Sequence, residues 1–249
     1  MSKLRTSSSR MDDIGFIGTL QNVISRRLIK PYSFGEDIVY EFTQDRGFLH
    51  QYFRLREIMY RRIFGTCEFS GEEDLHDKLS YILIARKGRL CVGGCRLTIR
   101  EGDEKWDLPM EEHGFNLRST FPNLQLDKKK HAEISRFAIL EDNGSRDVFN
   151  GMCQAMYDKV IISDVDYLFV KSTYPMARSW RTVANNFGVR STKICYDVEM
   201  PENPIHPDVK WYLIYSDISA LNRTNYKFRG PVSSKIIGMS VGRIPEVLN

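Results

Sequence analysis

The chain has 249 residues, of which 42% are hydrophobic and 27% charged, and its net charge is +4 at pH 7. These values are typical of a globular protein with a sizeable core, and they exclude a collagen, a coiled coil and a largely disordered chain. The mild net charge, without a dense basic face or a recognisable motif, argues against nucleic-acid binding. Because the chain has neither a run of 18 apolar residues nor an apolar stretch near the amino terminus, we expect a cytoplasmic protein without integral membrane contact.

The cysteines and histidines point to no disulfide framework and no metal site. The five cysteines are an odd set in a chain without an export signal, so we expect reduced thiols. Cys91 and Cys95 do not have the spacing of a zinc ribbon, and the five histidines are scattered along the chain. We therefore expect neither a metal nor a cofactor.

The first 70 residues hold one strong pattern. We expect residues 1–40 to be a partly disordered extension, in which residues 16–28 could form a short helix, and residues 41–249 to be a single domain. From residue 45 to residue 64 apolar side chains recur at steps of three and four, which predicts an amphipathic helix. Gly65 then ends it.

The remainder alternates between strands and helices. An acidic, irregular loop is expected over residues 70–78, a hairpin with strands 81–85 and 90–99 around Lys87-Gly88, and a long loop over 106–130. Further on, we expect strands at 131–140 and 167–171, helices at 148–162 and 176–186, and strands at 190–198 and 210–216. This order predicts one mixed α/β sheet with helices on its faces.

Two groups of charged residues stand out before residue 80. Arg56 and Tyr60 lie four residues apart and therefore share one face of the predicted helix. Glu72, Asp74 and Asp77 cluster in the acidic loop. A solvated arginine and a solvated loop would explain both groups without any function.

Two further groups lie in predicted strands. Arg96 follows the pair Gly93-Gly94, which is costly in a strand unless a group approaches closely or a bulge is needed. In the segment Glu133-Ile-Ser-Arg136-Phe137, regular alternation would send Glu133 and Arg136 to opposite faces, so both can serve one site only if the strand bulges or the sheet splays there. Taken singly, each charge is best explained by a structural salt bridge.

Taken together, these motifs resemble the acyl-homoserine-lactone synthases, the autoinducer synthases of bacterial quorum sensing. The resemblance covers about residues 40–190, and the Glu-x-Ser-Arg-Phe segment is its most specific part. It implies a GNAT-like acyl-CoA N-acyltransferase fold, with a mixed, mostly antiparallel sheet and helices on both faces. It also implies transfer of a fatty acyl group from an acyl carrier protein to the amine of S-adenosylmethionine, which then forms a lactone.

The resemblance assigns roles to individual residues. It implies catalytic roles for Glu133, Arg96 and Arg136, with Glu133 as the base that accepts the amine proton. It implies substrate-binding roles for Arg56, Tyr60, Asp74, Asp77 and Phe137. Asp74 and Asp77 could hold a cationic substrate or pair with the arginines. Contacts to the acyl chain could come from Phe149, Met152, Met156, Leu168 and Val170, although plain core packing is the preferred interpretation for each.

The donor is expected to be a carrier protein rather than coenzyme A. Coenzyme-A-using GNAT enzymes carry a glycine-rich loop at a helix start, whereas residues 140–148 contain one glycine and two acidic residues before it. A carrier protein is acidic and needs a basic docking surface. Candidate docking residues are Lys128, Lys129, Lys130, Arg178 and Arg181, with Arg190 and Lys193.

The sequence departs from the family at the acceptor side. Tyr60 stands where a phenylalanine is typical, and Gly65-Thr-Cys-Glu68 stands where a tryptophan is expected. The acceptor amine is therefore open, and the related N-acyl amino acid synthases, which use a free amino acid, are the alternative. A third hypothesis, motivated by the missing aromatic residues, is a non-catalytic GNAT-fold module that binds an acyl group or a carrier protein.

Overall fold

The computed structural model describes residues 38–141, 145–202, 208–221 and 236–237. All of them belong to the unit formed by residues 37–249. The predicted extension, including the helix expected at 16–28, lies outside the described residues except for its last three positions.

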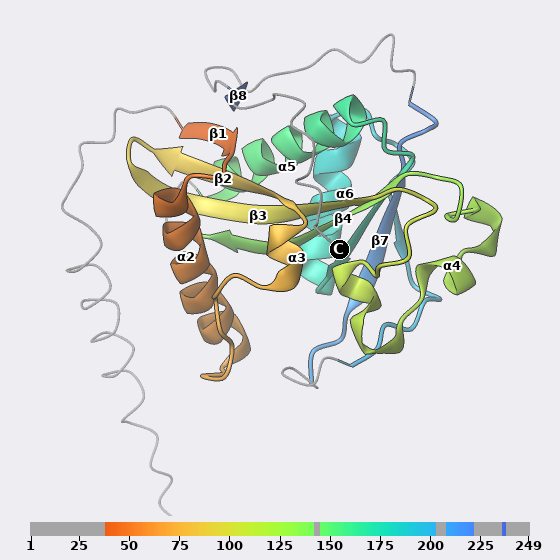
Figure 1. The fold of residues 1–249 in the computed structure, drawn as a ribbon, viewed down its shortest axis with the longest axis horizontal. Coiled ribbons are helices and arrows are strands. Elements are labelled where there is room, and N and C mark those ends of the chain that lie inside the picture. The colour runs from red at the N-terminus through yellow and green to blue at the C-terminus, as the bar shows by residue number, and fades with distance from the viewer. Residues whose placement is uncertain (1–37, 142–144, 203–207, 222–235, 238–249) are drawn as a thin grey trace, which may run out of the picture. The chain divides into compact units, whose positions relative to one another are not determined.

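An eight-stranded sheet forms the centre of the unit (Figure 1). Its strands, in spatial order, are β6 (Lys193–Cys195), β7 (Tyr212–Asp217), β5 (Tyr167–Ser172), β4 (His131–Ile139), β3 (Leu90–Arg100), β2 (Tyr81–Lys87), β1 (Ile38–Phe42) and β8 (Ile236–Ile237). Neighbouring strands are antiparallel except for β4 beside β5 and β1 beside β8. The predicted mixed, mostly antiparallel sheet is therefore confirmed.

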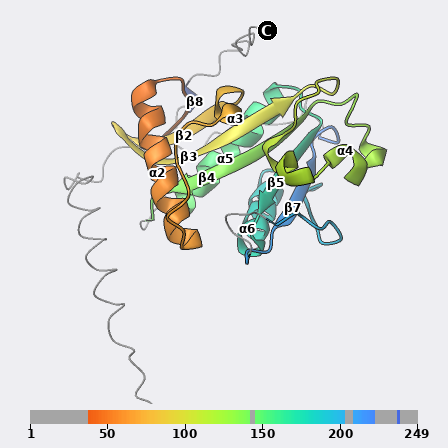
Figure 2. The same ribbon diagram turned by 60° about the horizontal axis from the view of Figure 1, so that its bottom comes forward.

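Helices cover both faces of this sheet, as predicted (Figure 2). On one face α2 (Arg46–Phe64) packs through Tyr52, Leu55 and Met59 against β2 and the end of β4. On the other face α5 (Ser145–Ile162) and α6 (Tyr174–Asn186) bury the larger apolar core. Each strand of the central sheet therefore presents its alternate residues to two different environments.

The amphipathic helix predicted over residues 45–64 is confirmed as α2. The Asp45 carboxylate accepts a hydrogen bond from the backbone N–H of Phe48 at 3.0 Å and so caps the start of α2. Gly65 ends it in the left-handed conformation, at φ +65°, which a residue without a Cβ adopts most readily.

Four local predictions need correction. The acidic loop at 70–78 is not wholly irregular, because Asp74 caps a short helix, α3 (Leu75–Lys78). The long loop contains η1 (Pro109–Gly114), α4 (Leu117–Thr120) and η2 (Pro122–Leu124). The strand expected at 190–198 shrinks to β6, and β1 begins at Ile38, inside the segment assigned to the extension. Short elements are difficult to predict because their neighbours in space, rather than their own periodicity, stabilise them.

A bulge in β4 reverses the alternation of its side chains, which is one of the two conditions under which Glu133 and Arg136 can serve one site. The pairing of β3 with β4 shifts register between Gly94 and Arg96, and Arg136 opposite this shift has φ +58°. The buried Tyr52 hydroxyl donates a hydrogen bond to the Arg136 carbonyl at 2.8 Å. Ser135 precedes the shift, so the bulge brings Arg136 to the face that Glu133 and Ser135 already share.

Beyond the bulge, β4 and β5 separate. They pair only from His131 with Tyr167 to Ile134 with Val170, although β4 continues to Ile139 and β5 to Ser172. Backbone N–H and C=O groups that point into this gap have no strand partner. Within the described part of the chain, no helix is long and apolar enough to cross a membrane.

The glycine pair in β3 generates a test of this architecture. A Cβ on Gly94 would lie 2.3 Å from a ring carbon of Tyr52, so Gly94→Ala must displace the tyrosine that holds the bulge. We expect a loss of about 1–3 kcal/mol in the free energy of unfolding, measured by urea denaturation. Gly93→Ala is the matched control, because its Cβ would meet side-chain ends of Met152 and Val148 at 3.0 Å, a milder contact than 2.3 Å, and should cost less. Equal losses in the two variants would contradict this account.

Candidate active site

Polar and charged side chains line the α2 face of the central strands. Register places Arg96 beside Ser135 and Thr98 beside Glu133, all on the face opposite to the α5 and α6 core. Arg96 and Glu133 are 1% and 2% exposed, so both charges are removed from water. Buried charges of this kind need partners in the protein, and the partners define the site.

Arg56 projects from α2 and is also 1% exposed. Its two terminal nitrogens donate to both carboxylate oxygens of Asp77 at 3.0 and 2.9 Å, and one also donates to the carbonyls of Gly71 and Glu72 at 2.9 and 2.6 Å. Its guanidinium lies 4.8 Å from the ring centroid of Phe53. The solvated arginine of the simplest interpretation is therefore wrong, and Arg56 fixes the segment before α3 onto α2.

Asp74 and Asp77 are held by α3 and by the arginines together. The two carboxylates form a reciprocal cap: the Asp77 N–H donates to Asp74 at 2.7 Å, and the Asp74 N–H donates to Asp77 at 3.0 Å. Arg96 donates to Asp74 at 2.7 Å and to Asp77 at 3.1 Å. Although burial alone would raise it, the pKa of Asp74 is lowered, because Arg96, the Asp77 N–H and Arg136 stabilise its ionised form. Of the two roles left open, the structure favours pairing with the arginines.

Arg136 completes the network but is less tightly held. A terminal nitrogen lies 3.5 Å from an Asp74 oxygen, and the guanidinium faces the rings of Phe69 and Tyr60 at 5.2 and 6.0 Å from their centroids. Its side chain keeps 29% of its exposure. Arg136 is therefore held by fewer and longer contacts than Arg56 and Arg96.

Glu133 lies in the same cluster without a direct ion pair. Its carboxylate accepts one hydrogen bond, from the backbone N–H of Met110 at 2.7 Å. Burial raises the pKa of Glu133 to about 7, against the opposing effects of Arg96, the Met110 N–H and Arg136. A carboxyl with this pKa exchanges its proton near neutral pH, as a general base must.

The Met110 N–H is positioned by a second buried ion pair. Glu111 accepts from Arg100 at 2.6 Å, and also from the backbone N–H groups of Leu108 and Leu117 at 3.1 and 2.9 Å. This pair fixes η1 to the sheet beside Glu133. This contact could not be predicted from the sequence, because a backbone donor carries no side-chain signature.

Aromatic rings from three segments border the cluster. Tyr60 stacks on Phe69, with centroids 4.8 Å apart, and Phe64 lies 5.6 Å from Tyr60 and 5.8 Å from Trp211. Residues 65–68 hold no tryptophan, but Phe69 and Trp211 place aromatic rings beside Tyr60 and Phe64. The reason for a non-catalytic module is correspondingly weaker.

Some predicted residues do not join the cluster. Phe137 follows the bulge and points to the opposite face, where it packs against Phe149 and Trp180, and its substrate-binding role stays a prediction. Met152, Met156, Leu168 and Val170 are buried in the main core, as preferred. Among the described residues no group of three acidic, cysteine or histidine side chains could hold a metal.

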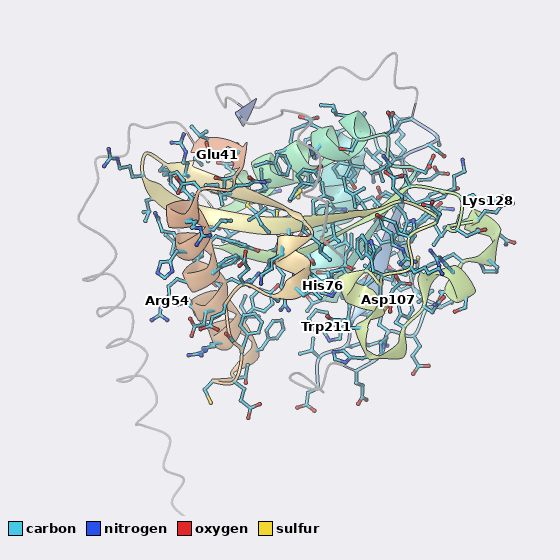
Figure 3. The ribbon with its side chains drawn as sticks, in the orientation of Figure 1. Glu41, Arg54, His76, Asp107, Lys128 and Trp211 are labelled. Carbon is cyan, nitrogen blue, oxygen red and sulfur yellow. The ribbon has the colours of Figure 1, made fainter. Side chains whose placement is uncertain are left out.

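The predicted docking residues do not form a single surface. Lys128, Lys129 and Lys130 precede β4, and Lys128 lies near α4 (Figure 3). Lys130 is also paired with Glu101 at 2.7 Å. Arg178 and Arg181 follow the other end of β5, at the start of α6, and because β4 and β5 are parallel the two groups lie toward opposite strand ends. The sequence alone could not show that these two groups of basic residues lie toward opposite strand ends.

A cleft of about 450 Å³ lies between α5 and α6, on the face opposite to Glu133. Arg146, Phe149 and Arg178 are among its lining residues. Both helices begin just beyond the ends of β4 and β5, and the cleft therefore lies beside the gap between these strands.

Comparisons with known proteins show the fold. The sequence matches no protein-family model and no curated protein sequence. The CoA-dependent acyl-homoserine lactone synthase BjaI, in its structure with SAM and isopentyl-CoA, gives a TM-score of 0.52 over 82% of this chain and 96% of its own, at 14% identity. This similarity shows a shared fold and confirms the GNAT-like fold that the sequence resemblance implied.

Two further solved structures give slightly lower scores. The AHL synthase LasI has a TM-score of 0.49 and 17% identity, covering 74% of this chain and 91% of its own. The N-acyl amino acid synthase FeeM, from uncultured soil microbes, has a TM-score of 0.48 and 12% identity with the same coverage.

The buried carboxylate of Asp77 should be essential for stability. Asp77→Asn leaves Arg56 and Arg96 with an incomplete counter-charge inside the protein, and we expect a loss of about 3–5 kcal/mol in the free energy of unfolding. Glu141→Gln is the matched control, since Glu141 and its partner Arg62 are both half exposed. Its effect should stay within about 0.5 kcal/mol. Urea denaturation checks both, and a Glu141 variant as unstable as the Asp77 variant would contradict the assignment.

The raised pKa of Glu133 predicts a pH-dependent stability. Because the pKa rises from 4.5 to about 7 on folding, the folded state binds this proton more tightly, and stability is lost as pH rises through 7. Glu133→Gln cannot ionise, so its free energy of unfolding should gain about 2 kcal/mol on the wild type between pH 5 and pH 8. Urea denaturation at both pH values measures the difference. Parallel pH profiles for the two proteins would show that Glu133 does not titrate near 7.

Proposed function

We propose that this protein is an N-acyltransferase that moves a fatty acyl group from the thioester of an acyl carrier protein to the α-amine of S-adenosylmethionine, which yields an acyl-homoserine lactone. The observation that carries this proposal is Glu133, a buried carboxyl with a pKa of about 7 beside the gap between β4 and β5. The fold shared with BjaI, which is described with SAM and isopentyl-CoA, supports the same reaction class.

The chemistry needs no nucleophile from the protein. The amine nitrogen attacks the thioester carbonyl carbon, the carbon–sulfur bond breaks, and the thiol of the donor leaves. Glu133 accepts the proton that the amine loses, and unpaired backbone N–H groups in the gap would stabilise the oxyanion. With S-adenosylmethionine, the carboxylate of the product then attacks its own γ-carbon, methylthioadenosine leaves, and the lactone ring closes.

The donor would approach from the other face of the sheet. Arg146 and Arg178 in the cleft between α5 and α6 can meet the phosphate of a phosphopantetheine arm, and the gap between β4 and β5 would admit the thioester. Residues 140–148, of which 142–144 lie outside the described residues, lack the glycine-rich loop for a pyrophosphate, which favours a carrier protein over coenzyme A. The docking surface would then lie around Arg178 and Arg181.

A specific observation favours the N-acyl amino acid synthase as second candidate. Asp77 is buried and bound by Arg56 and Arg96, and Asp74 is bound by Arg96 and contacts Arg136, so the negative charge that could hold a sulfonium is already paired with arginines. A free amino acid has no such cation. The two candidates share the donor, the base and the fold, and they differ only in the acceptor.

One assay separates these functions. Purified protein is incubated with an acyl carrier protein thioester, or with the matching acyl-CoA, and with S-adenosylmethionine or the 20 amino acids. Release of methylthioadenosine with an acyl lactone supports the first candidate, whereas an acyl amino acid without methylthioadenosine supports the second. Unchanged thioester with every amine would overturn both and favour the non-catalytic module.

Glu133→Gln should separate chemistry from folding. The amide keeps the shape and the acceptor for the Met110 N–H but cannot take a proton, so kcat should fall about 10²- to 10⁴-fold. The variant should remain as stable as the wild type at neutral pH or exceed it. Wild-type turnover by this variant would remove Glu133 from the mechanism.

A further inference from the structure

Lys171 is a charged residue that the mechanism above does not use. It follows Val170, the last residue of β5 that pairs with β4, and Phe169 two positions earlier pairs with Glu133. Lys171 therefore lies on the face of Glu133, at the point where the two strands separate. The residue is half-buried, and a lysine at the end of an apolar strand is an unusual choice unless its charge is needed there.

The Lys171 ammonium has no acidic partner in hydrogen-bonding contact among the described residues. Its recorded contact is with the ring of Trp211, whose centroid lies 5.4 Å from the nitrogen. Burial lowers the pKa of Lys171, while Glu133 and Glu112 oppose this effect. Glu112 is itself bound to His76 at 2.8 Å. Lys171 is thus near Glu133 but is not neutralised by a bridge to it.

The balance of charge in the cluster leaves positive capacity unused. The cluster holds four cations, Arg56, Arg96, Arg136 and Lys171, and the carboxylates that act on them are Asp74, Asp77, Glu133 and Glu112. When Glu133 is protonated, one positive charge is in excess. Among these cations, Arg136 has one ion-pair contact, at 3.5 Å, and Lys171 has only its contact with the Trp211 ring, so both are more loosely held than Arg56 and Arg96. An anion that binds between β4 and β5 would satisfy both.

We propose that Lys171 binds the carboxylate of the acceptor, assisted by Arg136, so that the acceptors are α-amino acids and amines derived from them. This inference rests on the proposed acyl transfer to an amine. The geometry supports it because one carbon atom separates the amine of an α-amino acid from its carboxylate. The amine can then reach Glu133 while the carboxylate reaches Lys171. Both S-adenosylmethionine and free amino acids carry this carboxylate, so the inference holds for either candidate acceptor.

Direct binding tests the inference without turnover. S-adenosylmethionine and L-tyrosine are compared with their carboxylate-free counterparts, decarboxylated S-adenosylmethionine and tyramine, by titration calorimetry. We expect the wild type to bind at least one carboxylated compound about 10- to 100-fold more tightly than its counterpart. Lys171→Met should abolish this preference. Lys210→Met is the matched control, because its ammonium lies at a similar distance, 5.6 Å, from the ring of Tyr212 but outside the cluster.

Kinetics distinguish binding from chemistry. With the carboxylated acceptor, Lys171→Met should raise KM about 10- to 100-fold and leave kcat and the donor KM nearly unchanged, and with the carboxylate-free acceptor it should change neither. Equal effects on both acceptors would overturn the inference and place Lys171 at the oxyanion instead. A preference that survives in Lys171→Met, or binding of neither carboxylated compound, would also overturn it. Wild-type turnover decides the proposed function separately, because it needs no comparison between variants.

Discussion

Two arginines buried to 1% exposure impose the main constraint on this structure. A guanidinium cannot be neutralised by losing its proton, so Arg56 and Arg96 require counter-charges inside the protein. Asp77 supplies them, and it does so only because α3 places its carboxylate between helix α2 and strand β3. The ion pairs thus specify how the acidic segment, the helix and the sheet come together, and a well-packed apolar core alone would not select this arrangement.

The bulge in β4 converts that scaffold into a candidate site. Without it, Arg136 would point toward α5 and α6, away from Glu133. Tyr52 stabilises the left-handed backbone of Arg136 through its hydroxyl, and Gly94 leaves the space in which the Tyr52 ring lies. Gly94, Tyr52 and the bulge therefore depend on one another, although they are spread over more than eighty positions of the sequence. Phe137, one residue later, returns to the opposite face, where it packs against Phe149, a lining residue of the cleft between α5 and α6.

Sequence reasoning recovered what local patterns encode. The periodicity from residue 45 to residue 64 and the stop at Gly65 predict α2, and the need for a bulge followed from the spacing of Glu133 and Arg136. Family resemblance named the charged residues that meet in space. Contacts made by backbone groups or by distant segments had no such signal: the Met110 N–H on Glu133 and Trp211 beside Phe64 depend on the complete fold. Lys171 is the one charged residue in the otherwise apolar or neutral strand β5, which is visible in the sequence. Its position near Glu133 and Trp211 is visible only in the structure.

The charged groups of the cluster divide by how fully they are satisfied. Asp77 is buried and accepts hydrogen bonds from two arginines and a backbone N–H, so its contacts are with the scaffold rather than with a substrate. Glu133 accepts one backbone hydrogen bond and no direct ion pair, which is why burial can raise its pKa to about 7. The cations differ in the same way, since Arg56 and Arg96 both bind Asp77 within 3.1 Å, whereas Arg136 has one ion-pair contact at 3.5 Å and Lys171 contacts the Trp211 ring. The three residues with the fewest hydrogen bonds and ion pairs are Glu133, Arg136 and Lys171, and all three lie near the gap between β4 and β5. If Glu133 is the base that we propose, two loosely held cations beside it suit an acceptor that carries an amine and a carboxylate on the same carbon atom.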